Sequence, residues 1–299
     1  MRVVSLPGDP GIGPRLADLL GLEYIQFLHK KFPDGEIYLR LPKVIENEGV
    51  LLVQSMYPNQ NDHTVELLLA LELLSRYRNS ITLLITYLAY ARQDKEFLAG
   101  EPVSLRSLVK ALSSLGLGTL VTIDAHSPLA LREFLGTSRY INIVPDEVFA
   151  EAISRRYRRE ELTVIAPDQG AEKRAASLAE LLGCRYIVVK KARDRITGNV
   201  THVLDPLDSV SGIAVVVDDI VSTGGTIAGI ASYLSSRGVR VVVAASHALF
   251  VGDAYDKLAR SGVVEIYALP TTGVTVSGVT YLDMVPYIAR KLREEKVVE

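Results

Sequence analysis

Residues 212–226 read GIAVVVDDIVSTGGT, and this stretch decides how the second half of the chain folds. The apolar run at 213–217 predicts a strand that is buried on both faces. Two acids, Asp218 and Asp219, follow the run, and a loop of hydroxyl residues and glycines then opens a helical pattern. This order is typical of a strand–loop–helix unit that binds an anion where the helix begins.

The residue types in the loop indicate which anion it binds. Backbone N–H groups at a helix start and nearby hydroxyls can point at a phosphate, and glycines allow close approach and positive φ. Acids at the carboxyl end of a strand can accept hydrogen bonds from sugar hydroxyls. An ordinary acidic turn with a threonine cap is the alternative. We expect a sugar phosphate to be bound by Asp218, Asp219, Ser222, Thr223, Gly224, Gly225 and Thr226.

Outward from this loop, short apolar runs alternate with helical patterns along the chain. We expect strands at 50–54, 81–87, 119–123, 162–166, 186–189, 213–217 and 239–245. We expect helices at 62–77, 103–115, 146–158, 171–182, 225–237 and 253–261. The alternation predicts an α/β fold with doubly wound, mostly parallel sheets.

A length of 299 residues suggests about two domains. We place the boundary near residue 145, which gives domains at 1–145 and 146–299. The segment from Gly49 resembles the segment from Gly212 in its order of strand, loop and helix. Either the two domains arose by duplication, or any two such units look alike.

Composition excludes several classes of protein. A chain that is 48% hydrophobic and 23% charged is not disordered. A net charge of −2 excludes a generic nucleic-acid binder, and the single Cys184 excludes a disulfide framework. The longest apolar stretch, near 83–91, is far shorter than the ~20 residues that cross a bilayer. We expect a cytoplasmic protein that binds neither nucleic acid nor membrane.

The loop at 215–226 resembles the 5-phosphoribosyl-1-pyrophosphate (PRPP) binding motif of type I phosphoribosyltransferases and PRPP synthases. The resemblance implies that the acid pair holds ribose hydroxyls and that the Ser/Thr/Gly segment holds the 5-phosphate. Many synthases have an acid where this chain has Ser222, whose hydroxyl still supplies a donor. Further segments favour a synthase over a transferase.

Residues 31–36, KFPDGE, resemble the adenine-binding hairpin of PRPP synthases, although alone they also fit a simple β-turn. The resemblance implies that Phe32 stacks on the base and that Asp34 and Glu36 accept from its amine. In that family the hairpin reaches across a subunit interface. The resemblance therefore implies a homo-oligomer that is at least a dimer.

Residues 90–94, YARQD, closely match the family segment that contacts ATP. Arg92 offers a planar fork for phosphate oxygens, and Gln93 offers a neutral donor and acceptor. Asp94 completes this expected ATP-binding segment. The alternative is a solvated turn after a strand.

Two single residues are expected to support Mg²⁺ through the same resemblance. The segment at 124–127 matches a family Asp-x-His whose histidine, here His126, helps hold the metal. The segment at 167–170 resembles a Pro-Asp-x-Gly whose acid, here Asp168, organises metal and ribose. A lone histidine is more often structural, and Asp168 also fits a helix cap.

Residues 190–193, KKAR, carry the expected catalytic cations. In PRPP synthases a Lys-x-Arg at this place stabilises the transition state, which here implies Lys191 and Arg193. Residues i and i+2 of a strand point to one side, so both cations can face one phosphate group. Lys190 is the competing register, and a solvated basic strand end is the alternative.

The resemblance covers nearly the whole chain and implies two similar phosphoribosyltransferase-type, Rossmann-like domains. The implied activity is that of a ribose-phosphate diphosphokinase, which converts MgATP and ribose 5-phosphate into AMP and PRPP. No general base is obvious; a hydroxyl pKa lowered by the metal, or the acid pair, could suffice. The alternatives are a phosphoribosyltransferase and a non-catalytic subunit that keeps the fold.

Overall fold

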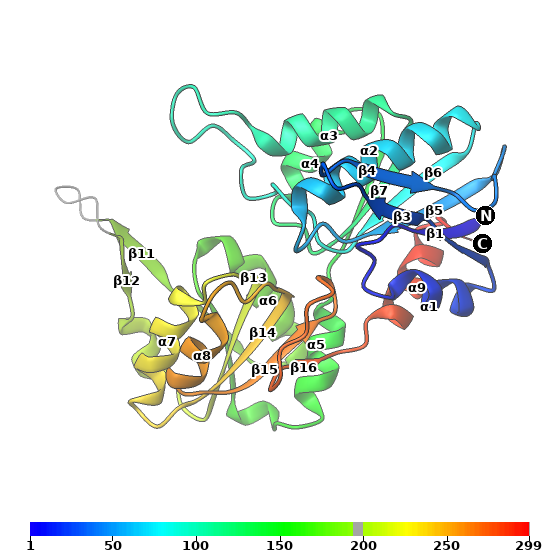
Figure 1. Cartoon of the computed structure of the whole chain (residues 1–299). Coiled ribbons are helices and arrows are strands. Elements are labelled where there is room, and N and C mark those ends of the chain that lie inside the picture. The colour runs from blue at the N-terminus through cyan, green and yellow to red at the C-terminus, as the bar shows by residue number, and fades with distance from the viewer. Residues whose placement is uncertain (194–199, 299) are drawn as a thin grey trace. The chain divides into compact units, whose positions relative to one another are not determined.

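The computed structural model describes residues 1–193 and 200–298, with side chains described outside 191–203. The chain forms two compact units (Figure 1). Unit 1 comprises Met1–Val144, Thr271–Gly273 and Met284–Glu299, and unit 2 comprises Pro145–Pro270 and Val274–Asp283. The division differs from our expectation in the last part of the chain, which returns to unit 1.

Unit 1 is built on a parallel sheet with the order β2-β1-β5-β6-β7-β8. Its strands are β1 (Arg2–Ser5), β2 (Glu23–Gln26), β5 (Gly49–Gln54), β6 (Ser80–Ile85), β7 (Leu117–Ile123) and β8 (Arg139–Ile143). A separate antiparallel hairpin follows β2 and consists of β3 (Leu28–Lys31) and β4 (Ile37–Arg40). The helices are α1 (Ile12–Leu20), α2 (Gln60–Arg76), α3 (Ser104–Ser114), α4 (Pro128–Phe134) and α9 (Val285–Glu294).

Helix α9 belongs to unit 1 because its apolar face packs on α1. Ile288 and Leu292 are fully buried, as is Leu16 on α1. Arg293 adds a hydrogen bond of 3.0 Å to the carbonyl oxygen of Leu19. An amphipathic helix has to bury its apolar stripe, and α1 supplies the surface.

Unit 2 has a second parallel sheet, with the order β10-β9-β13-β14-β15-β16. Its strands are β9 (Leu162–Ala166), β10 (Arg185–Val188), β13 (Ile213–Val221), β14 (Arg240–Ala248), β15 (Val263–Leu269) and β16 (Thr280–Tyr281). A hairpin of β11 (Lys190–Arg193) and β12 (Val200–Val203) follows β10. The α-helices are α5 (Asp146–Ser154), α6 (Glu172–Leu182), α7 (Gly225–Ser235) and α8 (Ala254–Arg260), and the short 3₁₀ helices are η1 (Arg159–Glu161), η2 (Gln169–Ala171) and η3 (Asp205–Ser209).

The two units have the same topology. In each sheet the second strand lies outside the first, the later strands continue on the other side, and a hairpin follows the second strand. This confirms the predicted α/β class with two similar units. Shared strand order and hairpin position favour duplication over chance likeness.

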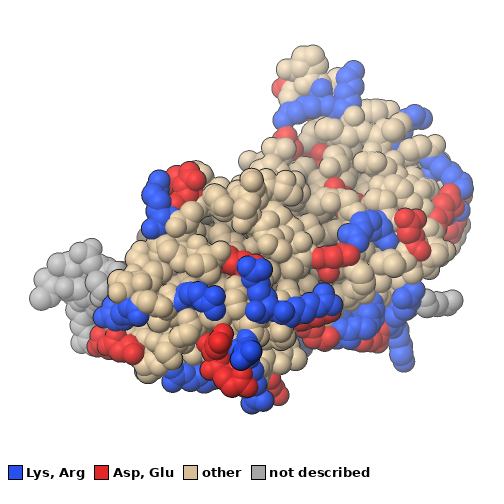
Figure 2. Space-filling model, turned by 90° about the horizontal axis from the view of Figure 1, so that it is seen from below, with Lys and Arg blue, Asp and Glu red and all other residues tan. Residues whose placement is uncertain are grey.

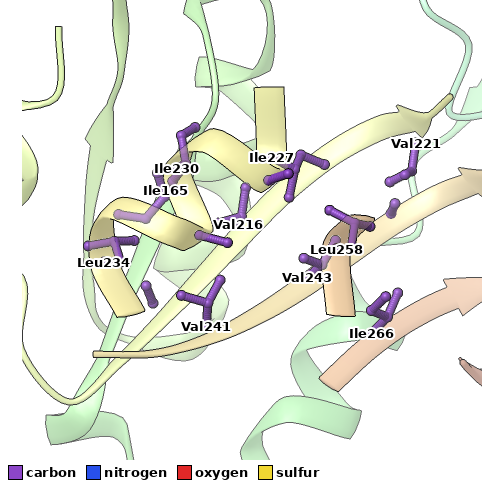
Figure 3. Close-up of a cluster of buried hydrophobic side chains, with 14 of the residues drawn as sticks. Ile165, Val216, Val221, Ile227, Ile230, Leu234, Val241, Val243, Leu258 and Ile266 are labelled. Atoms are coloured by element: carbon purple, nitrogen blue, oxygen red, sulfur yellow. The ribbon is translucent and has the colours of Figure 1, made fainter. Parts of the chain in front are cut away.

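The core of unit 2 shows why its strands read as continuous apolar runs. Val216 and Val243 are fully buried in the sheet, and α7 covers one face with Ile227, Ile230 and Leu234 (Figure 3).

On the surface, basic and acidic side chains are intermixed over the face in Figure 2, as the net charge of −2 suggests.

Every strand and helix that we expected is present, but some bounds differ. Strand β13 runs to Val221, so Asp218 and Asp219 lie within the strand and not after it. Helix α5 ends at Ser154, before the predicted end at residue 158. Short elements such as β2 escaped prediction because only one of its four residues is buried.

Candidate active site

The acid loop of unit 2 lies at the point where the strand order of the sheet reverses. Strands β9 and β13 are parallel neighbours there. The strand that follows β9 in the chain, β10, lies on one side of this pair, and the strand that follows β13, β14, lies on the other. Asp168 follows β9, and Asp218 and Asp219 lie near the carboxyl end of β13. Ligands of open α/β sheets bind at this switch point, which places the predicted sugar-phosphate residues where the fold favours a site.

The acid pair is held by local backbone hydrogen bonds. Oδ1 of Asp218 accepts from the N–H of Asp219 at 2.9 Å, and Oδ1 of Asp219 accepts from the N–H of Ile220 at 2.9 Å. Burial raises the pKa of Asp218 well above its usual range, and the charge of Asp219 raises it further. The charge of Arg174 opposes this increase in pKa, and the charge of Asp168 adds to it. These four side chains therefore form one electrostatic group.

The loop after β13 has the backbone of an anion cradle. Gly224 is left-handed, with φ 70°, and no side chain caps the start of α7. A Cβ built on Gly225 would meet no heavy atom within 4 Å. The first N–H groups of a helix lack partners within the helix, so α7 offers donors toward open space. Contrary to our expectation for both glycines, positive φ is needed only at Gly224.

A segment from later in the chain supports this loop. The N–H of Val251 donates to the carbonyl oxygen of Ser222 at 3.0 Å. Nζ of Lys257 on α8 donates to the carbonyl oxygen of Thr223 at 3.1 Å and lies 3.4 Å from Asp253. Sequence reasoning missed Lys257, since only the fold brings it next to a loop 34 residues earlier.

Asp168 caps the turn that follows β9. Its Oδ1 accepts a hydrogen bond of 2.9 Å from the N–H of Gly170 at the start of η2. The capping interpretation is therefore confirmed. Asp168 lies at the same end of the sheet as Asp218, and its charge acts on that carboxyl.

The expected catalytic cations lie on the hairpin of unit 2. Lys191 pairs with His202 and Arg193 with Val200 in the antiparallel register of β11 and β12. The side chains of Lys191 and Arg193 lie outside the described residues, so their catalytic roles stay predictions. Both residues lie in strand β11.

In unit 1 the segment at 31–36 forms the turn of the β3–β4 hairpin. The N–H of Phe32 donates to the carbonyl oxygen of Glu36 at 2.8 Å, and Oδ1 of Asp34 accepts from the N–H of Glu36 at 3.1 Å. Phe32 is 38% exposed, and Nζ of Lys30 lies 4.9 Å from the centroid of its ring. An exposed ring on a fixed turn can stack on a flat base.

The YARQD segment follows β6 and contacts the turn after the neighbouring β7. Oδ2 of Asp94 accepts a hydrogen bond of 2.6 Å from the Ser127 hydroxyl. Oε1 of Gln93 accepts from the Ser104 hydroxyl at 2.6 Å, at the start of α3. Arg92, just before them in the chain, is exposed. The structure therefore brings Arg92–Asp94 together with the turn that carries His126.

The turn at 124–127 is set by the next strand. Oδ1 of Asn142 on β8 accepts from the N–H of Ala125 at 2.9 Å and from the Thr122 hydroxyl at 2.8 Å. Asp124 is buried with φ 41°, and His126 is exposed. Asn142 was not anticipated, because nothing local in the sequence links it to this turn.

The two residues expected to support Mg²⁺ lie in different units, His126 in unit 1 and Asp168 in unit 2. Within the described ranges, no group of three or more His, Cys, Asp or Glu side chains has the geometry of a metal site. The carboxylates around Asp218 nevertheless supply the oxygen donors that Mg²⁺ prefers.

No helix in the described part of the chain has the length and hydropathy needed to cross a bilayer.

Comparison with known proteins agrees with the geometry. Residues 1–116 match the family model of the N-terminal domain of ribose phosphate pyrophosphokinase, and residues 145–280 match that of the phosphoribosyl transferase domain. The fold and the acid loop thus define a phosphoribosyltransferase-type protein.

Relatives of known name identify the family. The ribose-phosphate pyrophosphokinase of Sulfurisphaera tokodaii is 40% identical over 98% of this chain and 100% of its own length. That of Sulfolobus acidocaldarius is 39% identical with the same coverage. The phosphoribosylpyrophosphate synthetase structure from Mycobacterium smegmatis has a TM-score of 0.87 at 25% identity, covering 99% of this chain and 98% of its own. The chain belongs to the ribose-phosphate pyrophosphokinase family.

Proposed function

We propose that the protein is a ribose-phosphate diphosphokinase. The 1-hydroxyl oxygen of ribose 5-phosphate attacks the β-phosphorus of ATP, and the bond from that phosphorus to the α–β bridging oxygen breaks. The products are PRPP and AMP, and the hydroxyl proton is released. The observation that carries this proposal is the acid pair joined to an open helix-start cradle at the switch point of unit 2. Membership of the family supports it.

On the acceptor side, the cradle holds the 5-phosphate through the α7 amides and the hydroxyls of Ser222, Thr223 and Thr226. Asp218 and Asp219 accept hydrogen bonds from the ribose hydroxyls. On the donor side, the Phe32 ring stacks on adenine and Arg92 binds phosphate oxygens. These roles make positioning the main source of rate enhancement.

Charge on the transferred group is neutralised by Lys191 and Arg193 and by Mg²⁺ carried with ATP. Asp168 and the acid pair fit this cation because their oxygens are hard donors, and a cation would offset the repulsion that raises the pKa of Asp218. His126 is the other residue proposed to support Mg²⁺. We also propose a homo-oligomer, in which the hairpin of one subunit serves a neighbour.

The test is incubation of the protein with MgATP and ribose 5-phosphate, with AMP and PRPP both quantified. Equal amounts of the two products are expected. A second incubation supplies PRPP and a nucleobase other than adenine. Formation of the nucleoside 5′-phosphate with release of diphosphate there, and no AMP or PRPP from MgATP and ribose 5-phosphate, would indicate a phosphoribosyltransferase. An inert protein would indicate a non-catalytic subunit. Light scattering measures the oligomeric state, and a monomer would contradict action across an interface.

Lys191→Ala separates catalysis from binding. Loss of a cation that acts on the transition state lowers turnover about 100- to 1,000-fold. Binding of ribose 5-phosphate, measured by calorimetry, should be unchanged. The matched variant Lys190→Ala should keep most activity, and the reverse result would assign the catalytic role to the competing register.

A further inference from the structure

A buried carboxylate joins the hairpin of unit 1 to the core. Glu66 on α2 is 1% exposed. Its Oε2 accepts a hydrogen bond of 2.8 Å from Nε2 of Gln54 and lies 2.7 Å from Nδ1 of His63. Its Oε1 lies 3.3 Å from Nε2 of His29 on β3. One side chain thus contacts the last residue of β5, its own helix and the hairpin.

Burial makes the partners of this carboxylate important. A buried charge is costly unless it is paired and hydrogen-bonded. Gln54 and His63 are themselves buried and cover one oxygen, whereas the contact to the other oxygen comes from His29, whose side chain is 33% exposed. The hairpin therefore supplies a partner that the core does not, and moving the hairpin would expose Glu66 to that cost.

An ion pair between β3 and α2 reinforces this contact. Nζ of Lys31 donates to Oδ2 of Asp62 at 2.6 Å. Asp62 lies one turn before Glu66 on α2, and β4 also packs on this helix. Alternate residues of a strand point to opposite sides, so His29 and Lys31 share the face of β3 that meets α2.

The opposite face of the hairpin carries the ring that we assign to the nucleobase. Lys30 lies over the Phe32 ring, and Tyr38 makes an edge contact with it at a centroid distance of 6.2 Å. Lys30 and Tyr38 are direct partners across the hairpin. The hairpin thus has an anchoring face toward α2 and an aromatic face toward solvent.

We propose that His29, Lys31 and Glu66 are positioning residues that hold the hairpin on α2 and so present Phe32 to the nucleobase of ATP. This inference rests on the proposed function and assigns the donor side of its site. A two-stranded hairpin alone is marginally stable in water. The apparent affinity for ATP decreases when fewer molecules have the hairpin in place. These contacts therefore affect the KM for ATP.

His29→Ala tests the proposal in the full-length protein. We expect the KM for ATP to rise on the order of tenfold, with kcat and the KM for ribose 5-phosphate unchanged. His29→Gln keeps an N–H donor near the same place and should restore most of the affinity. Lys43→Met is the matched control, because Lys43 lies just after the hairpin and pairs with Glu23 on β2 at 2.8 Å. It should change neither constant.

Amide hydrogen exchange of residues 28–40 in the ligand-free protein gives a readout that is independent of activity. His29→Ala should speed exchange in the hairpin, and Lys43→Met should not. If His29→Ala leaves the exchange rates unchanged, or raises both KM values equally, the proposal that His29 anchors the hairpin is wrong. If the wild type forms no AMP and PRPP, the proposed function fails, and the exchange measurement still decides whether His29 anchors the hairpin.

Discussion

The two adjacent glycines of the phosphate loop should respond oppositely to the same substitution. Gly224 has φ 70°, where an alanine costs about 1–2 kcal/mol. A Cβ there would lie 3.4 Å from Ala254 and Leu258, an ordinary contact that adds no clash. Gly225 lies in the first turn of α7 with open space around it, where alanine is favoured by about 0.5–1 kcal/mol. Gly224→Ala and Gly225→Ala should therefore differ in stability by roughly 1.5–3 kcal/mol.

Scanning calorimetry of the ligand-free variants measures this difference. At about 2–4 °C per kcal/mol, Gly224→Ala should lower the Tm by about 2–8 °C and Gly225→Ala should raise it by about 1–4 °C. Substrate binding should respond in the opposite way to stability at Gly225. The open space beside this glycine is where the phosphate is expected, so an added methyl group would interfere with the phosphate. Gly225→Ala should raise the KM for ribose 5-phosphate on the order of tenfold despite its greater stability. Equal destabilisation by both variants would refute the backbone argument, and an unchanged KM would refute the position of the phosphate.

Three further predictions concern the residues around the site. Burial and a neighbouring carboxylate raise the pKa of Asp218, so its ionisation destabilises the folded protein as pH rises through that pKa. Asp218→Asn should therefore raise the urea midpoint of unfolding at neutral pH, measured with a chelator present. This gain in stability should vanish at pH values below the ordinary aspartate pKa. Lys257→Met removes the donor to the phosphate loop and should raise the KM for ribose 5-phosphate about two- to tenfold in initial-rate assays, leaving that for ATP unchanged. Asn142→Ala leaves the 122–125 donors without their acceptor and should lower the free energy of unfolding by about 1–3 kcal/mol, measured by denaturant titration.

The central strands could be predicted from the sequence because their residues are apolar on both faces. Val50–Val53 and Val215–Val217 are fully buried, and such runs have few other structures open to them. Edge strands lack this signal. Strand β2 is exposed at both ends, so its four residues carry no pattern that separates a strand from a loop.

The position of the acid loop was also predictable, since its acids, hydroxyls and glycines are contiguous. Its supports were not, because they depend on contacts that form only on folding. Lys257 reaches the loop from α8, and Asn142 reaches the 122–125 segment from a neighbouring strand. The anchoring role of Glu66 depends likewise on a histidine 37 residues earlier in the chain, at a distance that only the structure supplies. The roles of Lys191 and Arg193 remain predictions.

The return of α9 to unit 1 has a consequence for folding during synthesis. Helix α1 ends at Leu20, and its partner α9 begins at Val285, so the ribosome adds about 265 residues between them. At roughly 5–20 residues per second, the part of the apolar surface of α1 that packs on α9 stays uncovered for on the order of 15–50 s. All of unit 2 is translated in that interval. The first unit to be made is thus the last to be completed.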